Sequence, residues 1–514
     1  MRIVRRVLLG WAVLGPAAIG TFAQSWTLDE AFGNGGEISW TMAEWGVPIC
    51  LVPWTDGSWA AAMEMYDATG EVSTSICHAK PTGDCNCWTL PDPTFRVADL
   101  LTWPEDDWLR VAGTRYTADD SLGLVATIEI FAVDEAGTFW QGFGESNGRT
   151  ELEFISTFQE LNEARWDTLN GETIILLSGM SLDNCCIHQE IPVLAALDAN
   201  GVPLATFGHA GRVAIDLPNV GNYEGNEFRH DVGGVFHCAE VTDSGQIIAA
   251  GAFSNTAHYE TLAIRLDAGG QLDTTFADGG IHHLNGSNGD NHWIADIHES
   301  PNGDLLLLVD HHLSSDLEPS VQLLRLTSGG STLAWETTAC NDSPWMPLPH
   351  AFGDAGAIWT FGFNPVTGTV SPVATDHGSG AFETSCNALE TNTTTFDPKI
   401  GYGENRIGLI GRQSFGFTNN DYLYSIYQYQ ENLMTLDDNL LSHDAYACSE
   451  WAQIHGNSNN IGKDMFQHIQ NALGQLVSSP SCNHTQNPHF QIYIIHNSSE
   501  LITKRGCKVL LKGY

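Results

Sequence analysis

The stretch that decides the fold runs from Asp243 to Gly280 and reads DSGQIIAAGAFSNTAHYETLAIRLDAGGQLDTTFADGG. It begins with an Asp-Ser-Gly turn, because the glycine supplies the positive φ that a tight turn requires. An apolar strand follows from Gln246 and is expected to end at Gly251, and a second strand covers Thr261–Leu266. One glycine pair, Gly269-Gly270, separates these strands from a short segment that ends in Phe276, and a second pair, Gly279-Gly280, closes the unit. The unit is therefore predicted to be a set of short β-strands joined by glycine turns.

The same order of turn, strand, strand and glycine recurs on both sides of this unit. Counted at its turn, the pattern starts seven times, about 50 to 70 residues apart, at Gly57, Asp107, Gly171, Gly245, Gly303, Gly356 and Asn405. A spacing of this length fits four short strands per repeat, which is the blade of a β-propeller. Strands rich in Ile, Leu and Val fit sheets that are covered on both faces by neighbouring blades. The sequence thus predicts an all-β chain with a seven-bladed β-propeller over residues 24–437.

One aromatic residue keeps a fixed place in the repeat. Phe276 has counterparts at Phe32, Phe143 and Phe207, each followed closely by glycine. We interpret these rings as packing between units, because large aromatic side chains dominate such interfaces. Cys50 and Cys238 both stand seven residues before a turn glycine, which predicts buried structural thiols at equivalent places.

The repeat resembles a known family. Leu28–Gly36 (LDEAFGNGG) and Leu272–Gly280 (LDTTFADGG) are similar to the L-D-x-x-F-G-x-x-G signature of delta-60 β-propeller repeats. The resemblance is specific in the Asp243–Gly280 unit and degenerate elsewhere; Pro203 and Leu204, for example, replace the Leu-Asp pair. It implies a propeller scaffold in secreted bacterial proteins and no defined reaction.

The first 23 residues have the form of an export signal. Arg2, Arg5 and Arg6 precede an apolar stretch, and Thr21-Phe22-Ala23 offers small residues for cleavage before Gln24. The alternative, an uncleaved membrane anchor, is disfavoured by the shortness of the stretch and by Pro16 and Gly20 within it. No later stretch is long and uncharged, so no membrane insertion is expected after cleavage.

A second resemblance concerns residues 438–514, which we predict to be a small C-terminal β-sandwich-like domain. Asn471–Val477 (NALGQLV) is similar to the strand-turn-strand of type IX secretion sorting domains, although the Pro-Asn-Pro opening and the late Gly-x-Tyr are absent. The alternatives are a plain terminal sandwich and a poorly ordered tail. The resemblance implies an outer-membrane secretion machinery as partner. It also implies that the chain is secreted or held on the outer surface of a Gram-negative, Bacteroidetes-like bacterium.

Charge excludes one class of partner. Without Arg2, Arg5 and Arg6 the chain carries 18 basic and 62 acidic residues, a net charge of −44. Such a field repels DNA, RNA and anionic lipid, so no nucleic-acid role is expected. The acidity fits a surface adapted to a salty medium, and it is also compatible with a bound divalent cation; no other cofactor is predicted.

Twelve cysteines follow the export signal, and three of them crowd one segment. Cys85 and Cys87 form a C-x-C pair, which suggests a metal, but no second pair at zinc-finger spacing follows. A local disulfide from Cys77 to Cys85 or to Cys87 is the preferred interpretation, and spacing does not choose between the two.

The search for catalytic motifs identifies no site: the sequence lacks H-E-x-x-H and a phosphate-binding Gly-Lys-Ser. Asp56-Gly57-Ser58-Trp59 resembles a sialidase Asp-box, but ordinary turn chemistry explains it. Histidines and carboxylates gather between His282 and His312, and within this group Asp290, His292 and His311 are the candidate metal ligands. Adjacent histidines on a strand point to opposite faces, so at most one of His311 and His312 can join a site.

Two functions remain. The first is a non-catalytic binding or scaffold protein whose ligand is a polysaccharide or a surface protein. The second is a propeller hydrolase or lyase that acts on glycans at the axial channel. Carboxylates from different blades that meet at one place favour the enzyme, whereas a channel of Gly, Ser and apolar groups favours the scaffold.

Overall fold

The protein was analysed as a computed structural model that describes residues 25–432, with gaps at 43, 55, 68, 70, 104–105, 120–122, 146, 155, 184–188, 216, 218–232, 256–257, 285–290, 301–302, 313–319, 338–345, 348–350, 353–357, 365–368, 376–395, 404–405 and 414–421. The chain divides into one unit of Thr27–Gln430 and another of Met1–Trp26 with Glu431–Tyr514. The predicted export signal and the predicted C-terminal domain lie outside the described residues.

The described residues form strands and no helix, so the all-β prediction is confirmed. The first four-stranded antiparallel sheet consists of β3 (Trp45–Pro53), β4 (Trp59–Tyr66), β5 (Val72–Ala79) and β6 (Cys85–Thr89). An eight-stranded sheet follows, made of β7 (Phe95–Thr102), β8 (Leu109–Asp119), β9 (Gly123–Val133), β10 (Arg149–Leu152), β11 (Phe158–Leu169), β12 (Glu172–Asp183), β13 (Gln189–Asp198) and β14 (Arg212–Ala214).

The eight-stranded sheet consists of two antiparallel meanders, because β11 meets β9 only through one parallel pair, Phe158 with Ala126. Three further sheets repeat the four-stranded form. They contain β15 (Gly233–Val241), β16 (Ile247–Asn255), β17 (His258–Leu266) and β18 (Ile281–Leu284); β19 (Asn291–Glu299), β20 (Leu305–His312), β21 (Ser320–Leu326) and β22 (Thr332–Thr337); and β23 (Met346–Pro347), β24 (Ala351–Phe352), β25 (Ile358–Asn364) and β26 (Thr369–Thr375).

The last sheet joins the two ends of the Thr27–Gln430 unit. It contains β27 (Phe396–Gly403), β28 (Arg406–Gln413) and β29 (Tyr422–Asn432), with β1 (Ser25–Leu28) and β2 (Glu37–Met42) added from the start of the chain. β2 pairs antiparallel with β29, from Glu37 opposite Tyr427 to Met42 opposite Tyr422. This pairing covers a strand edge that would otherwise be exposed.

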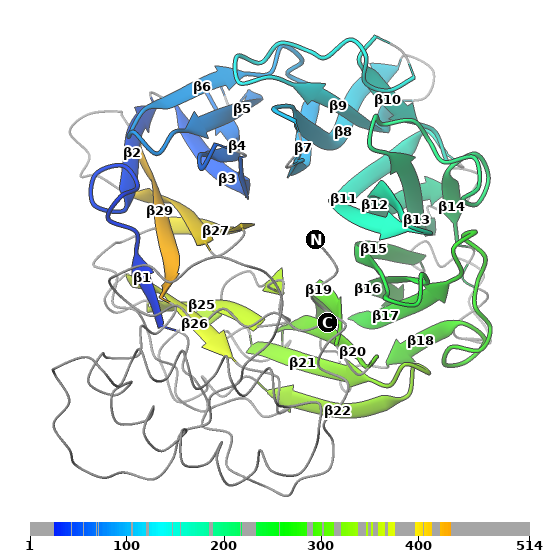
Figure 1. The fold of residues 1–514 in the computed structure, drawn as a ribbon. Coiled ribbons are helices and arrows are strands. Elements are labelled where there is room, and N and C mark those ends of the chain that lie inside the picture. Colours follow the sequence, from blue (N-terminus) through cyan, green and yellow to red (C-terminus); the bar gives the residue numbers. More distant parts are fainter. Residues whose placement is uncertain are drawn as a thin grey trace, which may run out of the picture. The chain divides into compact units, whose positions relative to one another are not determined.

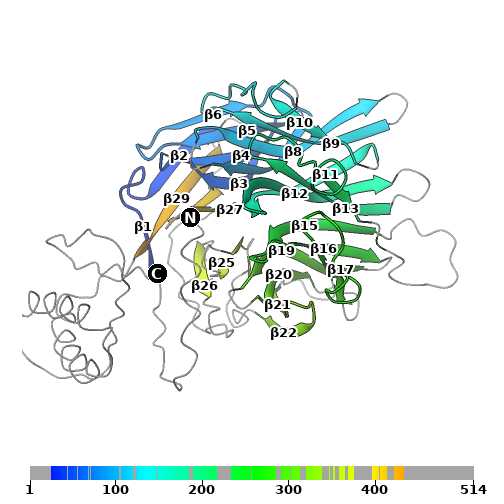
Figure 2. The same ribbon diagram turned by 45° about the vertical axis from the view of Figure 1, so that its right-hand side comes forward.

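Within the Thr27–Gln430 unit the sheets follow one another around a common centre (Figure 1), and the turned view shows their stacking (Figure 2). The first strand of each sheet contacts the first strand of the next, in the series β27, β3, β7, β11, β15 and β19, and β19 contacts β24. The fold is therefore propeller-like. None of the described residues forms a helix that could cross a membrane.

Each of these first strands contains a bulge. The register shifts by one residue between Val97 and Asp99 in β7, between Leu161 and Glu163 in β11 and between Phe236 and Cys238 in β15. Opposite the bulges of β11 and β15 lie Gly179 and Gly251, where an added Cβ would stand 2.0 Å from the Glu160 carbonyl oxygen and 1.9 Å from that of Val235.

This geometry corrects one expectation. The strand that was predicted to end at Gly251 continues to Asn255, because the glycine makes room for the bulge in the middle of the strand pair. β12 likewise continues beyond Gly179 to Asp183.

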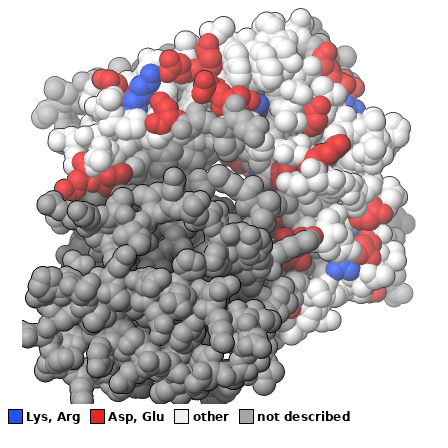
Figure 3. Space-filling model, viewed as in Figure 1, with Lys and Arg blue, Asp and Glu red and all other residues white. Residues whose placement is uncertain are grey.

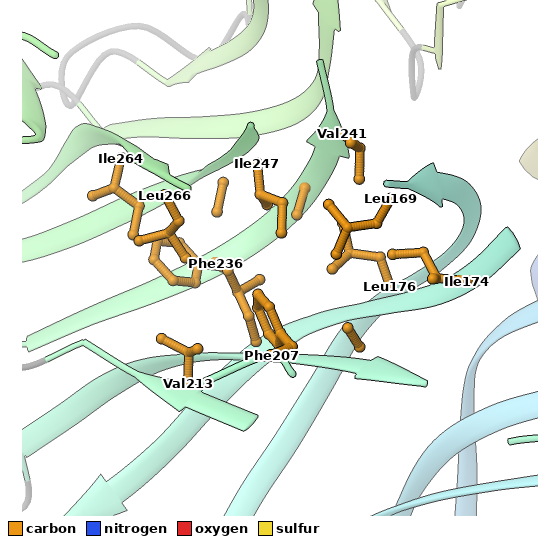
Figure 4. Packing of buried hydrophobic residues seen from close by; sticks show 14 of the residues in the cluster. Leu169, Ile174, Leu176, Phe207, Val213, Phe236, Val241, Ile247, Ile264 and Leu266 are labelled. Carbon is orange, nitrogen blue, oxygen red and sulfur yellow. The ribbon is translucent and has the colours of Figure 1, made fainter. Parts of the chain in front are cut away.

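The repeated phenylalanine packs between units, as predicted. Phe207 belongs to a core cluster that joins Leu176 and Leu194 of one meander to Phe236 and Ile264 of the next sheet (Figure 4). Phe32, Phe143 and Phe276 are also buried, each in a cluster of its own. The thiols at equivalent bulges differ: Cys238 is buried, whereas Cys50 is half-buried.

Candidate functional site

Three carboxyl groups occupy the same place in three first strands. Asp99 in β7, Glu163 in β11 and Asp296 in β19 each come directly after the bulge of their strand. Cys50 and Cys238 fill that place in β3 and β15. These strands lie nearest the centre of the unit (Figure 1), and side chains at and beside the bulges approach one another from different sheets.

Charged side chains continue two residues further along the same strand faces, since side chains alternate with a period of two. They are Arg165 in β11, Glu240 in β15 and His298 in β19. The Arg165 guanidinium lies 3.9 Å from Glu163 Oε1, 3.9 Å from Glu240 Oε2 and 3.8 Å from Asp296 Oδ1. His298 Nδ1 lies 3.4 Å from Glu240 Oε2. We call Asp99, Glu163, Arg165, Glu240, Asp296 and His298 the central acid cluster.

The carboxyl groups also hold neighbouring strands together. Asp99 accepts hydrogen bonds from the amides of Leu100 (2.8 Å) and, on β11, Ala164 (3.4 Å). Glu163 accepts one from the amide of Ala239 on β15 (2.9 Å). The acids of β7 and β11 are thereby fixed in position by the backbone of β11 and β15, respectively.

The cluster perturbs the ionisation of its members. Burial raises the pKa of Glu163 to about 8, although Arg165 and the Ala239 amide oppose this and Asp296 adds to it. Burial likewise raises the pKa of Asp99 to about 7, against the hydrogen bonds from Leu100 and Ala164. The nearby carboxylates raise the pKa of Arg165 despite its burial. Glu163 and Asp99 can therefore hold a proton close to neutral pH.

Solvent reaches part of the cluster. The exposed fraction is 29% for the Arg165 side chain, 22% for Glu163 and 15% for Asp296. Protonated acids beside carboxylates and a fixed guanidinium are the groups that general acid–base catalysis requires.

The predicted metal ligands lie elsewhere. β19 pairs with β20 so that His292 stands directly opposite His311, which places the two residues on one face of the sheet. Asp290 lies outside the described residues. The metal site at Asp290, His292 and His311 stays a prediction.

The other histidines between His282 and His312 do not join them. His282 Nδ1 lies 2.9 Å from the Gly330 carbonyl oxygen, and His283 is paired with Glu260. His298 belongs to the central acid cluster, so this group of histidines is divided among separate environments.

The Asp-box-like turn contains a serine next to a histidine. Ser58 Oγ lies 2.6 Å from His78 Nε2, and His78 Nδ1 lies 3.7 Å from Glu135 Oε2. The order of groups matches a hydrolase triad. However, Ser58 is fully buried and also bonds to Asp56, so no external substrate reaches its oxygen. We interpret this set as a structural turn.

Sequence reasoning missed the central acid cluster, although a signal was present. Asp296 stands seven residues before its turn glycine, as Cys50 and Cys238 do, and Asp99 and Glu163 stand eight residues before their turn positions. Aligning the repeats on the turn would have placed these five residues in two adjacent columns, three of them acidic.

No protein-family model and no curated protein matches this sequence. Among solved structures, the chain is similar to polysaccharide lyase Uly1, with 10% identity, a TM-score of 0.48 and coverage of 74% of this chain and 89% of that one. The endosialidase of phage phi92 matches with 9% identity, a TM-score of 0.35 and coverage of 77% and 70%. Prolyl oligopeptidase B from Galerina marginata matches with 10% identity, a TM-score of 0.39 and coverage of 77% of this chain and 51% of that one, so the chain spans about half its length. These similarities assign no role to any residue.

Proposed function

We propose that this chain is an exported, seven-bladed β-propeller enzyme that cleaves a polysaccharide at the central acid cluster. The observation that carries the proposal is the convergence of carboxyl groups from four first strands, β7, β11, β15 and β19, around Arg165. Seven blades follow if the two meanders of the eight-stranded sheet are counted separately. Export and passage through the outer membrane rest on residues 1–23 and 438–514.

Each group has a chemical part in the proposed reaction. Glu163, whose pKa is raised to about 8 by burial, donates a proton to the leaving glycosidic oxygen. Asp296 acts as the base: it takes a proton from the water that attacks the sugar in a hydrolase, or from the carbon beside the uronate carboxyl in a lyase, and the Arg165 guanidinium 3.8 Å away balances its charge. Asp99, which accepts hydrogen bonds from the backbone amides of Leu100 and Ala164, ties β7 to β11 at the site. A polysaccharide fits because the chain is predicted to be exported and because carboxyl groups bind and activate neutral hydroxyl-bearing substrates.

In the test, purified protein comprising residues 24–514 is incubated with a panel of neutral, amino-sugar and uronate polysaccharides. New reducing ends report any cleavage, and ultraviolet absorbance of an unsaturated product distinguishes a lyase from a hydrolase. Glu163→Gln and Asp296→Asn should each lower turnover by about 100-fold or more. The control is Glu172→Gln, since Glu172 is exposed at the start of β12 and lies outside the cluster.

Non-catalytic binding is the second candidate, and one observation favours it. Asp99 and Glu163 accept hydrogen bonds from backbone amides of β11 and β15, respectively, which is a structural use of a carboxyl group. Saturable binding of a polysaccharide without product, unchanged in Glu163→Gln, would establish the scaffold and refute the enzyme.

A further inference from the structure

Three cysteines meet on the outer strands of the first sheet. β5 pairs with β6 so that Cys77 lies opposite Cys87 and Ala79 opposite Cys85. Cys85 and Cys87 are two residues apart on β6 and therefore share a face. Cys77 and Cys87 form a disulfide, which confirms one of the two predicted pairings, and Cys85 remains a free thiol.

The sulfur atoms are arranged compactly. The three Sγ atoms lie within 4.8 Å of one another, and those of Cys85 and Cys87 are 3.9 Å apart. Among the residues that the structure describes, no other group of three His, Cys, Asp or Glu ligand atoms is so close. The thioether of Met63 on β4 adds a fourth sulfur, 4.0 Å from Cys77 Sγ.

Two of these spacings suit a metal held by sulfur, 3.9 Å between Cys85 and Cys87 and 4.0 Å between Cys77 and Met63, whereas the bonded sulfurs of Cys77 and Cys87 must first be separated by reduction. With a metal–sulfur bond of about 2.3 Å, ligand sulfurs stand roughly 3.8 Å apart in a tetrahedral site and roughly 4 Å apart in a trigonal one. Three thiolates with a thioether form the softest donor set that a protein offers, and such sets select Cu(I).

We propose that reduction of the Cys77–Cys87 disulfide creates a site for one Cu(I) ion, held by Cys77, Cys85, Cys87 and the thioether of Met63. A small thiol supplies the electrons: two thiol molecules are oxidised to one disulfide, and Cys77 and Cys87 each gain a hydrogen. The ion then replaces the protons of the three thiols, which are released to solvent.

The surroundings support both exclusion of water and entry of the ion. Met63 and Cys77 are fully buried beside Phe32 and Trp59, whereas Cys85 is half-buried and accessible from the sheet edge. The site uses none of the residues of the central acid cluster.

In the experiment the full chain is first reduced with a small thiol, and the thiol is then removed in the absence of oxygen. One equivalent of Cu(I) is added to this reduced protein. Because the other cysteines also bind copper, the site is located by alkylation of free thiols and mass mapping of the peptides. One equivalent should protect Cys85 and Cys87 from alkylation at least about tenfold, and Cys50 should stay reactive. A Cu(I) chelator then measures affinity, which should fall at least about tenfold in Cys85→Ser and less in Met63→Leu.

Cys50→Ser is the matched control, since Cys50 is also a half-buried thiol outside the Cys77–Cys87 disulfide but lies in the inner strand β3. It should leave the affinity of the first copper unchanged. Intrinsic tryptophan fluorescence confirms that each reduced variant remains folded. Full alkylation of Cys85 in the presence of one equivalent of Cu(I), or wild-type affinity in folded Cys85→Ser, would overturn the proposal.

Discussion

Replacing Glu163 by Gln should make the protein more stable at alkaline pH. Glutamine has the shape of a protonated glutamic acid, and its amide oxygen can still accept the hydrogen bond from the Ala239 amide. In the wild-type protein the buried carboxyl keeps its proton up to a pKa of about 8, whereas the same group ionises at its usual pKa in the unfolded chain. The folded state therefore binds more protons between these two values.

The sign and size follow from linkage. Where the folded state binds more protons, its stability falls as pH rises, so this group stabilises the fold fully below its usual pKa and stops doing so above pH 8. The shift from 4.5 to about 8 corresponds to about 5 kcal/mol, and relaxation of Arg165 reduces it. We expect Glu163→Gln to match the wild type at pH 4.5 and to exceed it by about 2 to 5 kcal/mol at pH 9.

Thermal unfolding followed by circular dichroism measures the difference. At pH 9 the Tm of the variant should exceed that of the wild type by at least about 2 °C, and at pH 4.5 the two should coincide. Glu172→Gln, at an exposed position, should show no such dependence on pH. A variant that is equally destabilised at both pH values would show that Glu163 is ionised throughout and stabilised by Arg165, which contradicts the proposed proton donor.

Three further predictions concern the fold and export. Gly179→Ala should lower the free energy of unfolding by about 2 to 4 kcal/mol in chemical denaturation, because its Cβ would stand 2.0 Å from the Glu160 carbonyl oxygen. Gly329→Ala, whose Cβ would stand 3.6 Å from its nearest neighbour, should lower it by less than about 1 kcal/mol. Equal losses in the two variants would refute the bulge argument. Phe276→Ala should cost about 3 to 5 kcal/mol, because the ring is fully buried and Arg265 lies 4.9 Å from its centroid; a loss below about 1 kcal/mol would contradict packing between units. N-terminal sequencing of the exported protein should begin at Gln24, and deletion of residues 442–514 should leave the chain in the periplasm, whereas its appearance in the medium would refute the sorting signal.

The fold could be predicted from the sequence because its signals are local and repeated. Turn glycines such as Gly245, which has a φ of 79°, and the strand after it lie within a dozen residues. The predicted length of that strand was wrong. A glycine often ends a strand, but Gly251 lies inside this one and makes room for the bulge of the partner strand. The sequence alone does not distinguish a glycine that faces a backbone carbonyl across a strand pair from a glycine that ends a strand.

The central acid cluster could not be predicted in the same way, because its members are far apart in the chain. Asp99 and Asp296 are brought together only by the closure of the unit. The many histidines between His282 and His312, by contrast, drew attention to His292 and His311. Adjacent histidines on a strand point to opposite faces, so closeness in sequence does not bring them into one site. Proximity in sequence identifies turns, whereas a site shared by several sheets depends on equivalent positions in successive repeats.

The residues that directly follow the bulges of the first strands occupy equivalent positions, so their side chains can be compared with one another. Cys238 occupies this position in β15 and is buried, so the fold accepts a small uncharged side chain there. Glu163 and Asp99 hold half-buried carboxyl groups at the equivalent position, and burial opposes their ionisation. A carboxyl group whose burial lowers stability at neutral pH is typical of a site maintained for its chemistry. Glu163→Gln separates the two candidate functions: it keeps an acceptor for the Ala239 amide and should fold in either case, but it should abolish polysaccharide cleavage by an enzyme and leave polysaccharide binding by a scaffold unchanged.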